Sequence, residues 1–262
     1  MFESPIGFFD SGLGGLTIRN EVMQLLPWEH TLYLADSAQA PYGDKTPDQI
    51  LEFSLRNTRW LLERGSKIIV VACNTATTNA IEVLRSEFAV PFIGIEPAIK
   101  PAALRSERKR VGVLATKGTL SSSLFASTSK LHAEGIEVLE QEGRGLVRLI
   151  ESGKLREPET RDRLKELLNP MLEAGIDHLV LGCTHYPLLI PMLKEVLPPD
   201  VQIVDCGPAV ARQTSAVLER MALMRPKGGV PVHKVFTTGD PEIADQMLRW
   251  MGHPEKALQV AF

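Results

Sequence analysis

The sequence has few cysteines, few aromatic residues and no long apolar run. Of its 262 residues, 3 are cysteines and 6% are aromatic. No membrane-spanning helix is predicted, because such a helix needs about 20 consecutive apolar residues. The opening MFESPIGFF lacks the basic and apolar segments of a secretory signal, so no export is expected.

Positive charge is not in excess either. The formal net charge is −3, and the basic cluster RSERKR at 105–110 is short. Proteins that bind nucleic acids or anionic membranes carry a concentrated basic face. We therefore predict neither partner, and we interpret the cluster as a solvated helix end or loop.

The three cysteines are Cys73, Cys183 and Cys206. They form no C-x-x-C pair, and their odd number makes a poor disulfide framework. Free thiols are therefore expected, and a reducing, cytoplasmic location suits them.

Short apolar runs alternate with longer segments of helical period. The helical segments at 47–65 and 160–175 end in Gly65 and Gly175, as a left-handed C-cap requires. The alternation predicts an α/β fold with mainly parallel sheets. The apolar runs are IGFF, TLYLA, KIIVVA, PFIGI, RVGVLA, IEVLE, HLVLG, VQIVD and HKVFTTG.

The two halves of the chain share a pattern that indicates a duplicated unit. IIVVACNTATTNAIEVLR at 68–85 resembles HLVLGCTHYPLLIPMLKEVL at 178–197, and each places a cysteine between an apolar run and a helical stretch. Open α/β sheets bind ligands at the carboxyl ends of their strands. Two halves related by a pseudo-two-fold axis would therefore present Cys73 and Cys183 to one ligand from opposite sides. The flanking segments that also correspond begin at 7 and 112, and at 90 and 201.

Two thiols on opposite faces of a ligand suit a reaction in which one removes a proton and the other returns it. An isolated buried cysteine is more often a packing residue, and we interpret Cys206 in this way. A nucleophilic pair of Cys183 with His185 would leave Cys73 unexplained. A metal site of Cys183, His185 and Cys206 would have an unusual ligand spacing, so no metal is predicted.

The strand-to-helix turn FFDSGLGGLTI at 8–18 partly matches a dinucleotide-binding turn. Gly12 and Gly14 are in place, but Thr17 occupies the third glycine position and Asp10 would repel a pyrophosphate. We interpret the turn as one wall of an amino-acid cleft, since a zwitterionic substrate tolerates the carboxylate.

Four motifs resemble those of the bacterial glutamate racemase family in order and spacing, over nearly the whole chain. They are FDSGLGGLT, APYG at 40–43, VVACNTATT and LGCTHYPLL. The resemblance implies a cofactor-independent enzyme that interconverts L- and D-glutamate and supplies D-glutamate for peptidoglycan. It also implies a homodimer of chains with two similar α/β domains, of residues 1–97 plus 207–262 and of residues 98–206. The active site would lie in the cleft between these domains.

Matched position by position, Cys73 and Cys183 resemble the two acid/base residues of that family. Asp36 and Glu151, together with His185, resemble polar residues that tune the thiols. Amide and hydroxyl groups at the strand-to-helix turns would stabilise negative charge as the α-proton leaves. The implied substrate-binding residues are Asp10, Ser11, Tyr42, Gly43, Asn74, Thr75, Thr184 and His185.

The chain departs from the family pattern in one loop. The family commonly has D-T-A-R before P-Y-G, whereas this chain has DSAQAPYG, with Ser37 in place of the threonine and Gln39 in place of the arginine. Only six residues precede Gly7, so activation by a peptidoglycan precursor is not expected. GCTH with His185 favours glutamate racemases over aspartate racemases, which remain an alternative. A second alternative is an amino-acid-binding module without turnover. No lysine site typical of a pyridoxal-dependent racemase is found, and no cofactor is predicted.

Overall fold

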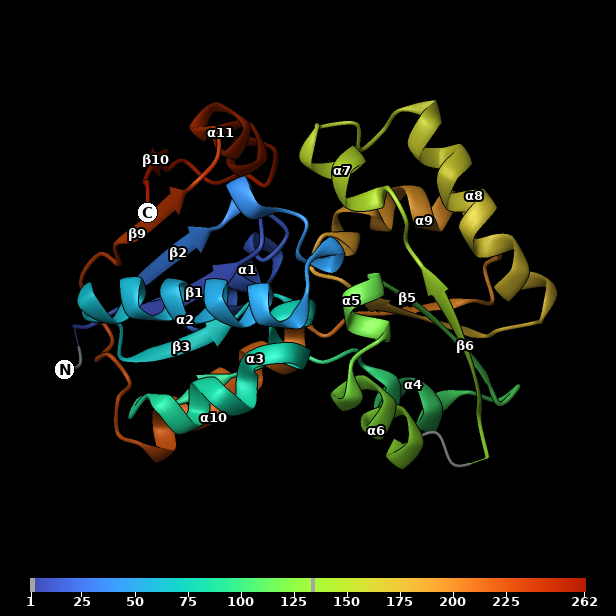
Figure 1. Ribbon diagram of the computed structural model, residues 1–262, viewed down its shortest axis with the longest axis horizontal. Helices are drawn as coiled ribbons and strands as arrows, with labels where there is room; N and C mark the ends of the chain where they lie inside the picture. The colour runs from blue at the N-terminus through green and yellow to red at the C-terminus, as the bar shows by residue number, and fades with distance from the viewer. Residues whose placement is uncertain (1–2, 133–134) are drawn as a thin grey trace.

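The computed structural model describes residues 3–132 and 135–262, which form two β-sheets flanked by helices (Figure 1). The first sheet has six strands in the order β10-β9-β2-β1-β3-β4, and the second has four in the order β6-β5-β7-β8. All of these strand pairs are parallel. The predicted α/β fold is therefore confirmed.

The strands coincide with the apolar runs of the sequence. The central strands β1, β2, β3 and β7 are buried at every residue, which is why they appear as continuous apolar runs. β10 was not predicted, because it has three residues and two of them are exposed. The bounds are β1 Ile6–Asp10, β2 Thr31–Ala35, β3 Ile68–Val71, β4 Phe92–Ile93, β5 Arg110–Ala115, β6 Glu137–Glu142, β7 His178–Gly182, β8 Gln202–Val204, β9 His233–Thr237 and β10 Ala257–Gln259.

Helices cover both faces of each sheet. In the first sheet, Phe9 and Val71 pack in the core that includes α2 and α3, whereas Phe8 and Val70 pack on the side of α1 and α10. The first sheet's helices are α1 Leu16–Leu25, α2 Pro47–Glu63, α3 Asn74–Glu87, α10 Gly207–Arg220 and α11 Pro241–Trp250. The second sheet's helices are α4 Ile99–Arg105, α5 Lys117–Leu120, α6 Ser123–His132, α7 Leu146–Glu151, α8 Pro158–Glu173 and α9 Ile190–Val196. Short 3₁₀ helices are η1 Ser37–Gln39, η2 Tyr42–Asp44 and η3 Tyr186–Leu189.

The ends of the long helices follow local sequence signals. Thr46 and Gln49 form a capping box at the start of α2, in which each side chain accepts a hydrogen bond from the other residue's backbone amide. Gly65 and Gly175 both have φ of +80°, beyond the ends of α2 and α8. The predicted left-handed glycine caps are therefore confirmed.

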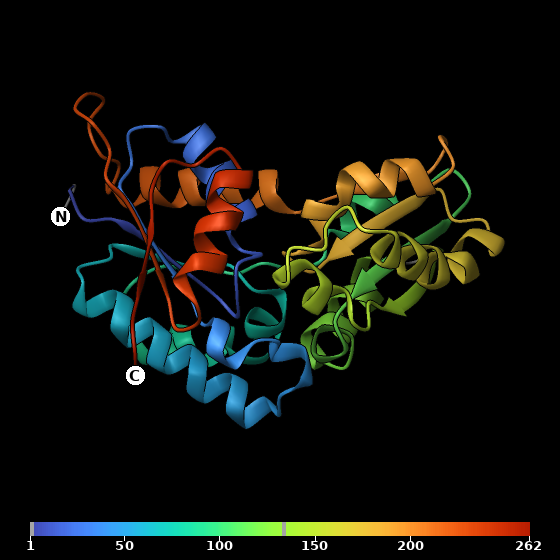
Figure 2. The same cartoon turned by 90° about the horizontal axis from the view of Figure 1, so that it is seen from above.

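The strand order repeats between the two sheets. The order β2-β1-β3-β4 in the first matches β6-β5-β7-β8 in the second, and β3 and β7 each precede one of the two equivalent cysteines. Figure 2 shows that the N-terminal and C-terminal segments share one lobe, while the middle of the chain forms the other. This arrangement agrees with the repeat found in the sequence, and the exact domain limits stay a prediction. In the described ranges, no helix is both long and apolar enough to cross a membrane.

Candidate active site

A small, narrow cavity lies between the two sheets. Its walls come from turns that follow the carboxyl ends of strands β1, β3 and β7, where an α/β sheet binds its ligands. Cys73 and Cys183 both line it, one from each sheet. The lining residues are Ser11, Pro41, Tyr42, Gly43, Cys73, Asn74, Thr75, Thr116, Val147, Gly182, Cys183, Thr184 and His185.

Nine of the twelve residues singled out from the sequence line this cavity. The other three, Asp10, Asp36 and Glu151, do not line it, but each is hydrogen-bonded to a residue that does. Sequence reasoning missed Thr116, whose hydroxyl lies 2.8 Å from that of Thr75 across the cavity wall. The internal repeat contained the signal for it. Aligning Gly7 with Gly112 places Thr116 at the position of Ser11, after the equivalent strand.

Gly12 and Gly14 allow the first turn to approach the second sheet closely. A Cβ atom at Gly12 would collide with the Glu151 carboxylate, and one at Gly14 would collide with the His185 ring. Thr17, in place of the third glycine of a dinucleotide turn, donates a hydrogen bond to the Thr184 carbonyl at 3.1 Å. The turn is thus shaped to fit the facing turn of the same protein.

Cys73 lies at the start of α3, where its sulfur accepts a hydrogen bond from the Ala76 amide at 3.4 Å. Its thiol also lies 3.7 Å from the Ser11 hydroxyl, which donates to Asp10 at 3.4 Å. Burial, and secondly the Asp10 carboxylate, raise the pKa of the Cys73 thiol well above its usual value. Both effects favour the Cys73 thiol over its thiolate.

Asp10 is completely buried at the end of β1 and accepts a hydrogen bond from the Gly15 amide at 2.8 Å. Burial raises the pKa of this carboxyl group, and the charge of His185 opposes that shift. Asp10 can therefore act on Cys73 both through Ser11 and through its charge.

Cys183 is part of a different arrangement. Its sulfur lies 3.7 Å from Nδ1 of His185, and Nε2 of the same ring lies 2.5 Å from a Glu151 carboxylate oxygen. That oxygen also accepts a hydrogen bond from the Leu13 amide at 2.7 Å.

These contacts decide the charge of His185. Burial opposes protonation, but the hydrogen bonds to Cys183 and Glu151 outweigh it and raise the pKa of the imidazole well above its usual value. Burial likewise opposes ionisation of Glu151, whose bond to His185 prevails and lowers the pKa of the carboxyl group. An imidazolium ring thus faces Cys183, whereas the Asp10 carboxylate lies near Cys73.

Asp36 forms no hydrogen bond with the sulfur of Cys73 or of Cys183. Its carboxylate accepts the Tyr42 hydroxyl at 2.6 Å, the Arg56 guanidinium at 2.6 Å and the Thr238 hydroxyl at 3.0 Å. Tyr42 and Gly43 line the cavity, so Asp36 supports the loop that forms this wall.

Asn74 is buried at the cavity wall. Both polar atoms of its side chain lack a hydrogen-bond partner among the residues that the structure describes. A buried amide without partners is costly, so this side chain is suited to bind a ligand. In those same ranges, no three His, Cys, Asp or Glu side chains are grouped to hold a metal ion.

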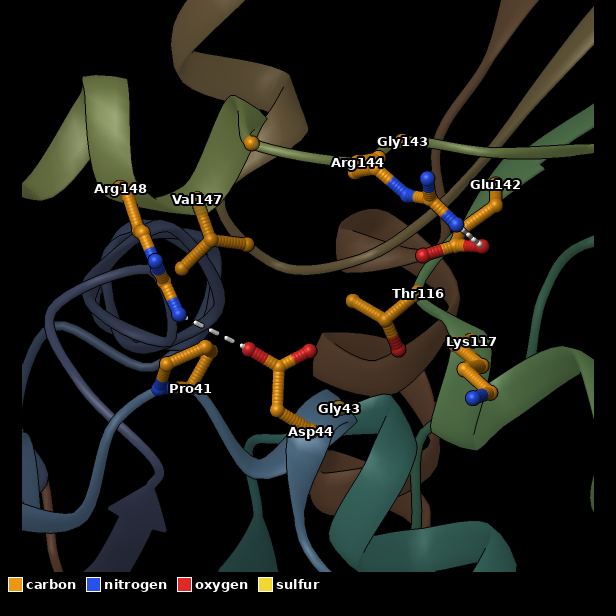
Figure 3. A pocket seen from close by; sticks show the side chains of 11 residues that line it. Pro41, Gly43, Asp44, Thr116, Lys117, Glu142, Gly143, Arg144, Val147 and Arg148 are labelled. Carbon is orange, nitrogen blue, oxygen red and sulfur yellow. Dashed lines mark hydrogen bonds and ion pairs between the residues drawn. The ribbon is translucent and has the colours of Figure 1, made fainter.

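A larger outer pocket adjoins the cavity and shares Pro41, Gly43, Thr116 and Val147 with it (Figure 3). Its lining includes Lys117, Arg144 and Arg148 as cations and Asp44 and Glu142 as anions. Arg148 of α7 pairs with Asp44 of η2 at 3.2 Å, which joins the two lobes at the entrance. Arg144 pairs with Glu142 at 3.6 Å, so two of the three cations are paired with carboxylates.

Comparisons with known proteins agree with this fold. The Asp/Glu/hydantoin racemase family profile matches residues 17–214. A glutamate racemase from Roseiflexus sp. is 47% identical over 240 residues, which cover 91% of this chain and 88% of that protein.

Solved structures give the same result. The crystal structure of glutamate racemase RacE1 from Bacillus anthracis has a TM-score of 0.91 at 30% identity, and it covers 100% of this chain and 99% of its own. Escherichia coli glutamate racemase, in complex with L-glutamate and the activator UDP-MurNAc-Ala, has a TM-score of 0.87 at 35% identity, covering 98% of each chain.

The comparisons identify an amino-acid racemase, and the chain belongs to the Asp/Glu/hydantoin racemase family. The resemblance inferred from the motifs is thereby confirmed.

Proposed function

We propose that this protein interconverts L- and D-glutamate by a two-base mechanism in which Cys73 and Cys183 are the acid and base. The observation that carries the proposal is the cavity with one thiol from each sheet, in opposite electrostatic surroundings. Glutamate is the substrate named for the relatives in Roseiflexus, Bacillus anthracis and Escherichia coli, the last in complex with L-glutamate.

With one enantiomer, Cys183 beside the His185 imidazolium acts as the base and Cys73 acts as the acid. The Cys183 sulfur removes the α-proton from one face of the substrate, and the Cys73 thiol delivers its proton to the other face of the α-carbon. The product is the opposite enantiomer, with Cys73 now ionised and Cys183 protonated. The other enantiomer reacts by the reverse transfer, so each direction uses both sulfurs.

Negative charge develops on the α-carbon and carboxylate as the proton leaves. The Asn74 amide, with Thr75 and Thr184, would bind the substrate carboxylates, and the N-terminus of α3 favours negative charge there. Asp10 would offset the substrate ammonium.

The remaining parts of the proposal concern the protein in the cell. D-glutamate would serve peptidoglycan synthesis, the enzyme would act in the cytoplasm as a homodimer, and no cofactor would be required.

We also propose residues 1–97 with 207–262, and residues 98–206, as the two domains. The separation of strands between the two sheets supports this division.

The deciding experiment follows the loss of optical activity of L-glutamate by circular dichroism, with purified protein and no added cofactor. Racemisation of glutamate with little turnover of aspartate is expected. Turnover of aspartate instead would support the alternative racemase, and binding of both amino acids without turnover would support a binding module. In D₂O at early times, the product should carry deuterium at the α-carbon while recovered substrate keeps hydrogen, because separate bases remove and deliver the proton.

Cys206 offers a matched control for the cysteine mechanism. It is also buried, and burial with the nearby Asp205 raises the pKa of its thiol well above the usual value, but it is not among the cavity residues. We expect C206S to retain racemisation. Loss of activity in C206S without loss of folding would contradict the assignment.

A further inference from the structure

Arg56 of α2 neutralises a buried carboxylate behind the cavity wall. Asp36 has a side chain that is 1% exposed, and its oxygen lies 2.6 Å from Nη2 of Arg56. Taking a carboxylate out of water is costly unless it is paired and hydrogen-bonded. The same Asp36 oxygen accepts the Tyr42 hydroxyl at 2.6 Å, so cation and phenol share one anionic partner.

The cavity wall depends on this shared oxygen. Tyr42 is 1% exposed, and its hydroxyl also accepts a hydrogen bond from the Asn57 amide at 3.0 Å. Tyr42 and Gly43 lie in the short helix η2 and line the cavity beside Cys73. A shift of Asp36 would therefore move a wall that would contact the substrate.

Two aromatic rings contact the Arg56 guanidinium. The Arg56 Cζ atom lies 4.4 Å from the ring centre of Phe262 and 5.1 Å from that of Phe53. Phe53 in turn contacts the Tyr42 ring, with centroids 5.5 Å apart. Such cation–π contacts restrict an otherwise flexible side chain.

We infer that Arg56 is a positioning residue for substrate binding, which acts through Asp36 on Tyr42 and Gly43 and is itself ordered by Phe262. This inference rests on the racemase function proposed above. Arg56 does not line the cavity and takes no part in the proton transfer.

The test compares R56Q with R56K and with R64Q. R56Q should lower kcat/KM for glutamate by roughly ten- to hundredfold, mainly through KM, because small displacements of a binding wall have effects of that order. R56K keeps the charge and should restore most of the loss. R64Q is the matched control, since Arg64 directly follows α2 and stacks on Trp60 of that helix at 3.7 Å but has no contact with Asp36. It should stay within about twofold of wild type.

A double-variant cycle shows whether Arg56 acts through Asp36. In a D36N background no carboxylate remains to be neutralised, so adding R56Q should change KM by less than about twofold. F262A should have a smaller effect than R56Q, about two- to fivefold, in line with the strength of one exposed cation–π contact. An equal loss from R56Q in both backgrounds would overturn the inference.

Amide hydrogen exchange of residues 37–46 provides a readout that does not depend on catalysis. R56Q should accelerate exchange in this segment, whereas R64Q should not. Unchanged exchange together with unchanged KM would refute the role of Arg56. Absence of racemisation by the wild-type protein would instead refute the proposed function, and the exchange experiment would still decide about Arg56.

Discussion

Glu151 to Gln is the perturbation with the clearest expected effect on catalysis. The substitution keeps the shape of the side chain and an oxygen that can accept the Leu13 amide, but it removes the negative charge beside His185. The Glu151 oxygen lies 2.5 Å from Nε2 of His185. Without that charge, the His185 imidazolium loses one of the two groups that raise its pKa, and only Cys183 remains.

The size of the effect follows from this contact. A hydrogen bond between charged groups contributes about 1.5–3 kcal/mol, more than a neutral one. If the imidazolium stabilises the Cys183 thiolate in the transition state, the loss corresponds to a roughly ten- to hundredfold lower kcat/KM. Because two enantiomers have equal free energy, kcat/KM must fall equally in both directions.

The pH profile gives a second measure. The pKa of His185 is raised, so the imidazolium persists above the pH at which a free histidine loses its proton, and activity should fall as pH rises through that raised value. The E151Q profile should begin this fall at a lower pH. The pair should also stabilise the fold below the unfolded pKa of the imidazole, and this contribution disappears as pH rises through the folded value.

The assay is circular dichroism of initial rates with each enantiomer, between pH 6 and 10 as a rough working range. E159Q is a suitable control, since Glu159 pairs with Lys154 at 2.9 Å on the exposed surface. That variant should stay within about twofold of wild type. An E151Q enzyme with wild-type kcat/KM and an unshifted alkaline limb would refute the role given to the Glu151–His185 pair.

Three further predictions concern the cavity and the core. C73S and C183S should each lose about 10²-fold or more of kcat/KM in both directions, and near wild-type turnover by either would exclude the two-base assignment. N74A should raise KM by about tenfold with little change in Tm, because its polar atoms have no partner among the described residues; an unchanged KM would contradict this. K67M should reduce the free energy of unfolding by about 3–5 kcal/mol in urea titrations, because Lys67 pairs with Glu29 at 2.6 Å and both are buried. A loss below about 1 kcal/mol would show that Glu29 is neutralised in another way.

The strands were predictable because their sequences carry the signal locally. A strand buried on both faces must be apolar throughout, as the IIVV run of β3 is. The ends of α2 and α8 were predictable because a left-handed cap favours glycine, as at Gly65 and Gly175. β10 was missed, since two exposed residues in a strand of three leave no pattern to detect.

Pairing between distant residues was not predictable in the same way. Glu151 and His185 meet across 34 residues, and Arg56 reaches Asp36 from the following long helix. Such contacts depend on how helices pack on the sheets, and no local pattern encodes that packing. Thr116 is an intermediate case, because the internal repeat pointed to its position although its residue type differs from Ser11.

By itself, the sequence determined the α/β class, the repeated unit and the pair of cysteines, because each is expressed in residue type and spacing along the chain. Only the tertiary structure decided how Cys73 and Cys183 differ. Cys73 is buried next to the Asp10 carboxylate, whereas Cys183 faces an imidazolium stabilised by Glu151. The charge state of a thiol depends on the groups that surround it in space, and those groups come together only when the two sheets pack against each other.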